Sequence, residues 1–196
     1  MGRTLKNSFF PTNYMATRMY NFNKNNTLAH VQTPPGLTFC KECQDTTQVN
    51  YHHAKAFVLS CIDFRLRDNI TSNLTNLGYK NEYDDSAVAG GSLGYNGLLH
   101  YNWSTTITDN IDLAIQLHDI EEILLIDHMQ CGAYAAQYPT MVKGGEDEYN
   151  YHISNLNTAA QSLKIKYPTL KIKKYIISID GGTMIDIDIY EGPFPF

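Results

Sequence analysis

Three side chains in this sequence have the chemistry and spacing of zinc ligands. Cys61 lies in one short segment, and His128 and Cys131 lie together in another. Two thiolates and one imidazole are three protein ligands, the number that a catalytic zinc site uses while it keeps a fourth position open. Asp63 brings a carboxylate beside that position, and Arg65 can hold the carboxylate through a bidentate hydrogen bond. These five residues predict a site that makes hydroxide at neutral pH.

Both segments follow short apolar runs that are typical of buried strands. Residues 56–61 form a continuous apolar run, as in strands covered on both faces, and residues 122–126 lead directly towards His128. Ligands of parallel α/β sheets bind at the carboxyl ends of the strands. Because Cys61 and His128 each come where a predicted strand ends, we expect them to be neighbours in space.

The chain beyond residue 54 alternates between helical and strand patterns. Apolar residues at helical spacing predict three helices, at 66–77, 105–119 and about 150–166. Short apolar runs predict three further strands, at 85–89, 172–179 and 184–189. The alternation predicts a single α/β domain with a mainly parallel central sheet flanked by helices. The last two strands could instead form one hairpin at the sheet edge.

Glycines at positions 90, 91, 94 and 97 follow the second predicted strand. Their spacing fits neither G-x-G-x-x-G nor a phosphate loop that ends in Gly-Lys-Ser/Thr. We interpret them as a tight turn near the site rather than a nucleotide-binding loop.

Together the two segments resemble the β-class carbonic anhydrases. That family is identified by Cys-x-Asp-x-Arg after its first strand and His-x-x-Cys-Gly after a later one. The matching residues are Cys61-Ile62-Asp63-Phe64-Arg65 and His128-Met129-Gln130-Cys131-Gly132, with Ala89-Gly90-Gly91 similar to the family's Ala-Gly turn. The resemblance covers about residues 54–190.

This resemblance implies one zinc ion per chain, bound by Cys61, His128 and Cys131, with water or hydroxide as the fourth ligand. It implies reversible hydration of carbon dioxide to bicarbonate and a proton, with Asp63 and Arg65 as a catalytic dyad. In the family, the residue matching Asp63 can swing onto the zinc and close the site when its Arg contact is lost. The family also forms dimers, so the resemblance implies a homodimer or a higher homo-oligomer.

Two positions depart from the family pattern. Asp127 stands where the family usually has Gly, and Ala87 and Val88 replace its Arg-Asn pair. A carboxylate at position 127 could orient His128, or could raise the pKa of the zinc-bound water. The substrate pocket can therefore differ from that of the family.

Four residues beside the motifs are candidates for the pocket lining or for support of the ligands. These are Gly90, Gly91, Asp127 and Gly132. Related enzymes of this fold hydrolyse carbonyl sulfide or carbon disulfide, and a non-catalytic relative could bind zinc or bicarbonate without turnover. Both alternatives to carbon dioxide hydration stay open.

Other interpretations of the cysteines also stay open. Cys61 and Cys131 could be ordinary buried thiols, with His128 as a core histidine. Cys40 and Cys43 have the Cys-x-x-Cys spacing, so they could join His128 and Cys131 in a closed structural zinc site, or form a redox pair. The closed site would leave Asp63 and its neighbours unexplained, and two free thiols at positions 40 and 43 are the simpler interpretation.

The chain divides into residues 1–50, which are predicted to form an N-terminal arm, and residues 51–196, the zinc-binding domain. Residues 1–41 contain five Lys or Arg and no acidic residue. That composition could mark an organelle transit sequence. The alternative is an arm that packs on the core or on a partner subunit.

Composition excludes several classes of function. A net charge of −5 and a pI near 5.7 argue against a nucleic-acid binder or a binder of anionic membranes. We find no apolar run near the roughly 18 residues of a membrane span. Four cysteines in 196 residues are no disulfide framework, so we expect a reducing, cytoplasmic location.

Overall fold

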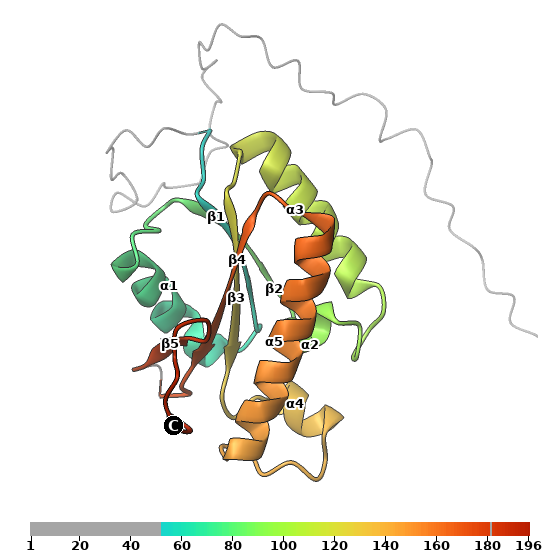
Figure 1. Cartoon of the computed structure of the whole chain (residues 1–196), viewed down its shortest axis with the longest axis vertical. Helices are drawn as coiled ribbons and strands as arrows, with labels where there is room; N and C mark the ends of the chain where they lie inside the picture. Colours follow the sequence, from blue (N-terminus) through green and yellow to red (C-terminus); the bar gives the residue numbers. More distant parts are fainter. Residues whose placement is uncertain (1–51, 181) are drawn as a thin grey trace, which may run out of the picture. The chain divides into compact units, whose positions relative to one another are not determined.

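A five-stranded sheet forms the centre of the computed structural model, which describes residues 52–180 and 182–196 (Figure 1). The strands are β1 (Ala56–Ser60), β2 (Tyr83–Ala87), β3 (Glu122–His128), β4 (Lys171–Ile177) and β5 (Met184–Asp186), in the spatial order β2-β1-β3-β4-β5. The first four run parallel, and β5 pairs with β4 in the antiparallel direction. The predicted α/β architecture is therefore confirmed, with the last two strands as the edge hairpin that was the alternative.

Within the described residues three long helices flank the sheet. Along the chain, a shorter helical segment comes between a strand and each of these helices. The long helices are α1 (Arg67–Asn76), α3 (Trp103–His118) and α5 (Glu146–Lys166). The short ones are the 3₁₀ turn η2 (Phe64–Leu66), α2 (Ser92–Tyr95) and α4 (Gly132–Gln137). The sequence did not predict the short segments, because one or two turns cannot show an apolar period.

The sheet buries a different apolar cluster on each face. On one face α3 and α5 pack over Phe57, Leu59, Ile123 and Leu125. On the other face α1 packs over Val58, Leu124 and Ile126, and Figure 1 shows these helices on opposite sides of the sheet. Successive side chains of a strand point to opposite faces. The same alternation, continued along β3, directs Asp127 to the α5 face and His128 to the α1 face.

Helix α5 differs most from its prediction. It begins at Glu146 instead of residue 150, and three acidic residues in its first turn suit the positive end of the helix dipole. Its fully buried apolar residues are Leu156, Ala159 and Leu163. Its first half also buries Glu148 and His152, which no apolar pattern could reveal.

Several predictions concern the N-terminal part of the chain. The arm at 1–50, its acid-free segment and the pair Cys40 and Cys43 lie outside the described residues. The residues that the structure describes all belong to one compact unit. Among them, no helix has both the length and the apolar character needed to cross a bilayer.

Candidate metal centre

Cys61, His128 and Cys131 meet at the carboxyl ends of β1 and β3. Their ligand atoms all lie within 4.8 Å of one another, and the two sulfur atoms are 4.0 Å apart. Two thiolates on a tetrahedral zinc, with Zn–S of about 2.3 Å, would be about 3.8 Å apart. All three side chains are buried. The group could therefore hold a metal ion with little movement of the sulfur atoms.

The two ring nitrogens of His128 have different surroundings. Nδ1 lies 2.9 Å from the carbonyl oxygen of Met129, so it is the nitrogen that carries a proton and donates. Nε2 is buried and has no hydrogen-bond partner among the residues that the structure describes. A buried nitrogen without a partner is unfavourable, and a metal ion would use its free lone pair. The tautomer set by Met129 is thus the one that a metal site needs.

The two thiols of the centre are tightly coupled. The hydrogen bond from Cys131, although burial opposes it, lowers the pKa of Cys61 to about 4. The same hydrogen bond, together with burial, raises the pKa of Cys131. Thiolates are the form that binds metal, so a divalent cation would displace the protons of both thiols.

Asp63 and Arg65 form a bidentate ion pair beside the three candidate ligands. Arg65 donates from Nε to Asp63 Oδ1 at 2.9 Å and from a terminal nitrogen to Oδ2 at 2.5 Å. These hydrogen bonds hold the pKa of Asp63 well below its usual range. Asp63 Oδ2 lies 3.9 Å from His128 Nε2. A carboxylate is therefore fixed next to the ligand group without being part of it.

The backbone around Cys61 is also held by specific contacts. Gly90 donates its N–H to Cys61 Sγ at 3.3 Å, which favours the thiolate. Arg67, which the sequence analysis did not single out, donates to the carbonyl oxygen of Cys61 and to Ser60 Oγ. Because Arg67 is the first residue of α1, this contact joins the helix to the ligand.

Asp127 does not orient His128 in the way that the sequence suggested. Its oxygens accept hydrogen bonds from the Ser92 N–H at 2.9 Å, the Ser92 hydroxyl at 2.5 Å and the Tyr134 hydroxyl at 2.7 Å. A fourth contact joins Asp127 Oδ2 to His152 Nδ1 at 3.0 Å. The reason for the difference is the strand alternation, which turns residues 127 and 128 to opposite faces of β3.

The other candidate residues fall around this carboxylate and the ligands. Gly91 precedes α2 with φ of +52°, and a Cβ atom built on it would lie 2.4 Å from Asp127 Oδ1. Gly132 is exposed and is the first residue of α4, directly after Cys131. The structure thus places Gly90 against a ligand, Gly91 against Asp127, and Gly132 at the start of a helix.

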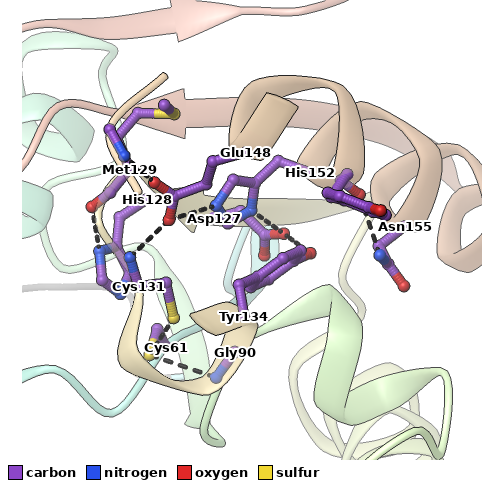
Figure 2. A network of polar contacts seen from close by, with 12 residues as sticks. Cys61, Gly90, Asp127, His128, Met129, Cys131, Tyr134, Glu148, His152 and Asn155 are labelled. Atoms are coloured by element: carbon purple, nitrogen blue, oxygen red, sulfur yellow. Dashed lines mark hydrogen bonds and ion pairs between the residues drawn. The ribbon is translucent and has the colours of Figure 1, made fainter. Parts of the chain in front are cut away.

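Two buried residues near the centre were missed by the sequence analysis, Glu148 and His152 (Figure 2). Glu148 accepts the N–H of Cys131 at 2.7 Å through Oε1. Burial opposes the charge of His152, but the hydrogen bond to Asp127 and the nearby Glu148 carboxylate outweigh it and raise the pKa of the imidazole. Both residues lie on the inward side of α5, one turn apart. The sequence offered one sign of them, two ionisable residues spaced i, i+4 in the segment that forms α5.

Comparisons with known proteins give two relatives of similar length. An uncharacterized protein of Rickettsia bellii is 33% identical over 133 residues, which cover 66% of this chain and 80% of that protein. The uncharacterized protein RC0076 of Rickettsia conorii is 32% identical over 143 residues, 72% of this chain and 75% of that protein. No family model matches the chain.

Among solved structures, the chain is similar to a tetrameric β-carbonic anhydrase from Sordaria macrospora. The TM-score is 0.49 and the sequence identity 14%, over 69% of this chain and 81% of that one.

Proposed function

The chain belongs to the same family as these two uncharacterized Rickettsia proteins, and we propose that it is a zinc enzyme that interconverts carbon dioxide and bicarbonate. The observation that carries the proposal is the place of Asp63, whose carboxylate is fixed by Arg65 at 3.9 Å from His128 Nε2. A structural zinc site is closed by four protein ligands, whereas a catalytic site has three and a free position. Three ligands with an immobilised carboxylate beside them favour the catalytic case.

Cys61, His128 and Cys131 are the residues that would hold the zinc ion. Their two soft sulfur ligands and one imidazole form a donor set that zinc commonly accepts. When bound, the ion supplies hydroxide near neutral pH, because it lowers the pKa of a coordinated water from about 15.7 towards 7.

Asp63 would orient the nucleophile. An ionised carboxylate can only accept hydrogen bonds, so Asp63 would accept the proton of the nucleophile and leave a lone pair free to face the substrate carbon. Arg65 binds both carboxylate oxygens and so keeps Asp63 ionised and away from the ligand group. Orientation of this kind lowers the entropic part of the barrier.

We further propose that the enzyme works as a homodimer or higher homo-oligomer in a reducing compartment such as the cytoplasm. Ile62 and Phe64, on either side of Asp63, are 59% and 84% exposed. A second copy that covers these side chains would shield the site from bulk water. The reducing compartment is proposed because Cys61 and Cys131 must stay reduced to bind metal as thiolates.

The direct test is stopped-flow hydration of carbon dioxide by zinc-loaded protein from about pH 6 to about pH 9. We expect a rate that rises with pH, because the negative charge of the Cys61 and Cys131 thiolates would raise the pKa of a coordinated water. Cys61→Ser should lose both bound zinc and activity. Asp63→Asn should keep the zinc and lose about 10²-fold in rate, the usual effect of a lost positioning group.

Asp68→Asn is the matched control, since it makes the same chemical change at an exposed position of α1. It should leave the rate unchanged. Absence of hydration in protein with one zinc per chain would contradict the proposal. Hydrolysis of carbonyl sulfide or carbon disulfide by that protein would then identify a different substrate at the same site, and inactivity towards all three would favour a zinc- or bicarbonate-binding protein.

A further inference from the structure

We propose that His152 positions the Cys131 ligand through Glu148, as the central cation of a buried chain Asp127–His152–Glu148. This inference rests on the metal centre of the proposed function and not on the identity of the substrate. His152 touches no ligand itself, so its role is to position one.

The contacts of the chain run from the sheet to the ligand. His152 Nδ1 lies 3.0 Å from Asp127 Oδ2, and Nε2 lies 3.6 Å from Glu148 Oε1. The second separation is too long for a good hydrogen bond but close for an ion pair. Glu148 Oε1 in turn accepts the N–H of Cys131 at 2.7 Å. Figure 2 shows His152 between the two carboxylates, with Glu148 directed at the backbone of Cys131.

Glu148 holds both ends of one segment. Its Oε1 binds the N–H of Cys131, just before α4, and its Oε2 binds the N–H of Gly144, close to the start of α5, at 2.6 Å. One carboxylate thereby closes the loop that contains α4. A shift of Glu148 would move the backbone of Cys131, and with it the sulfur atom.

The three side chains Asp127, His152 and Glu148 are closed to water. Asp127 is 1% exposed, and Glu148 and His152 are 0% exposed. Two buried carboxylates this close together require a compensating positive charge, and the imidazolium of His152 is the group that faces both. Tyr134 from α4 adds its hydroxyl to Asp127, and its ring lies over that of His152 with centroids 3.7 Å apart. Contacts from β3, α4 and α5 thus surround the imidazole.

A buried network of this kind could serve the fold alone, so the test needs a measurement that loss of stability does not move. We would measure the zinc dissociation constant by competition with a chromophoric chelator, and the thiolate-to-metal charge-transfer band of the cobalt-loaded protein. In the metal-free protein we would follow hydrogen exchange of the Cys131 amide by NMR. The last measurement reports the Glu148 contact whether or not zinc binding or catalysis occurs.

His152→Gln and Glu148→Gln are the informative variants, and Asn155→Ala is the matched control. Asn155 is a buried polar residue of the same helix, and its hydrogen bonds go to Asn96, to the Tyr151 carbonyl and to Tyr138 at the far end of α4, not to Cys131 or Glu148. We expect the first two variants to weaken zinc binding by about 10–100-fold, the usual effect of losing a residue that supports a ligand. Their cobalt charge-transfer band should shift, and the Cys131 amide should exchange faster. Asn155→Ala should change stability without changing these three readouts.

Wild-type zinc affinity and a protected Cys131 amide in His152→Gln would overturn the proposal. If that variant does not fold, the double variant Asp127→Asn/His152→Gln removes one carboxylate together with the cation and should show the same weakened affinity. A double variant with wild-type affinity and amide protection would be equally contrary. Failure of the proposed reaction is distinguishable, because it would appear as inactive wild-type protein in which the Cys131 amide still depends on His152.

Discussion

Gly91 lies between the backbone nitrogen of Cys61 and the buried carboxylate of Asp127. We expect Gly91→Ala to be strongly destabilising. Its backbone has φ of +52° and ψ of −107°. This combination lies outside the left-handed helical region, and a side chain in so sparsely populated a conformation costs about 1–3 kcal/mol. The added Cβ would also lie 2.4 Å from Asp127 Oδ1, an atom that accepts the Ser92 N–H.

The second contribution comes from Asp127, because the other neighbours of the new Cβ are at ordinary contact distances. The carbonyl oxygen of Ile126 and the nitrogen of Cys61 would be 3.4 Å and 3.5 Å away. If Asp127 moves aside, it loses a charged hydrogen bond worth about 1.5–3 kcal/mol. With the backbone contribution, the expected loss for Gly91→Ala is about 2.5–6 kcal/mol.

Gly78→Ala provides the matched control. Gly78 also has a positive φ, +88°, but a Cβ atom there would meet nothing within 4 Å. Urea unfolding of both variants at one zinc concentration should therefore show Gly91→Ala to be less stable by at least about 1.5 kcal/mol. In an Asp127→Ala background the difference should shrink by the Asp127 contribution of about 1.5–3 kcal/mol. Equal losses for Gly91→Ala and Gly78→Ala, or a difference that Asp127→Ala does not reduce, would contradict this expectation.

Three other perturbations test the packing, the buried charge and the dyad. Leu124→Ala, at a fully buried position of a central strand, should cost about 2–5 kcal/mol in urea unfolding, whereas Leu113→Ala, at a half-exposed position, should cost less than about 0.5 kcal/mol; similar losses would contradict the assigned core. Because the pKa of His152 is raised on folding, its charge contributes stability that is complete below about pH 6.5 and is lost as the pH rises through the folded-state pKa. The urea midpoint should therefore decline on the alkaline side in wild type and less so in His152→Gln, and parallel declines would count against a charged imidazole. Arg65→Ala should slow carbon dioxide hydration while lowering the urea midpoint only slightly, because the Arg65 side chain is 43% exposed; an unchanged rate would show that Arg65 is not needed to hold Asp63.

The sequence predicted the ligand group because each motif is local and each follows a buried strand. Cys61 comes directly after β1, and His128 is the last residue of β3. Strands β1 and β3 are neighbours in the sheet, with Ser60 paired to Ile126. Parallel neighbours bring their carboxyl ends together, so an order of strands and two apolar runs were enough to place the ligands side by side.

The support of the ligands could not be predicted in the same way. Glu148 and His152 occupy inward positions of α5 that continue the stripe of Leu156 and Leu163, but they are polar and do not add to an apolar period. Their burial depends on Asp127, the carboxylate that faces them from strand β3, and this is a tertiary contact. The orientation of Asp127, by contrast, was predictable, since two adjacent residues of a strand cannot both face the metal.

The reversal of the chain after β3 explains how one loop can serve both faces of the sheet. His128 and Asp127 point to opposite faces. Cys131 nevertheless contacts both the candidate ligand Cys61, through its sulfur, and the buried Glu148, through its N–H. Gln130 has a left-handed backbone, with φ of +58°, which lets the chain turn sharply past the sheet edge. Cys131 therefore follows the turn with its Sγ towards Cys61 and its backbone towards Glu148. The buried charges on the α5 face thus contact the candidate ligand group at a point beyond the end of the strand, where alternation no longer separates the two faces.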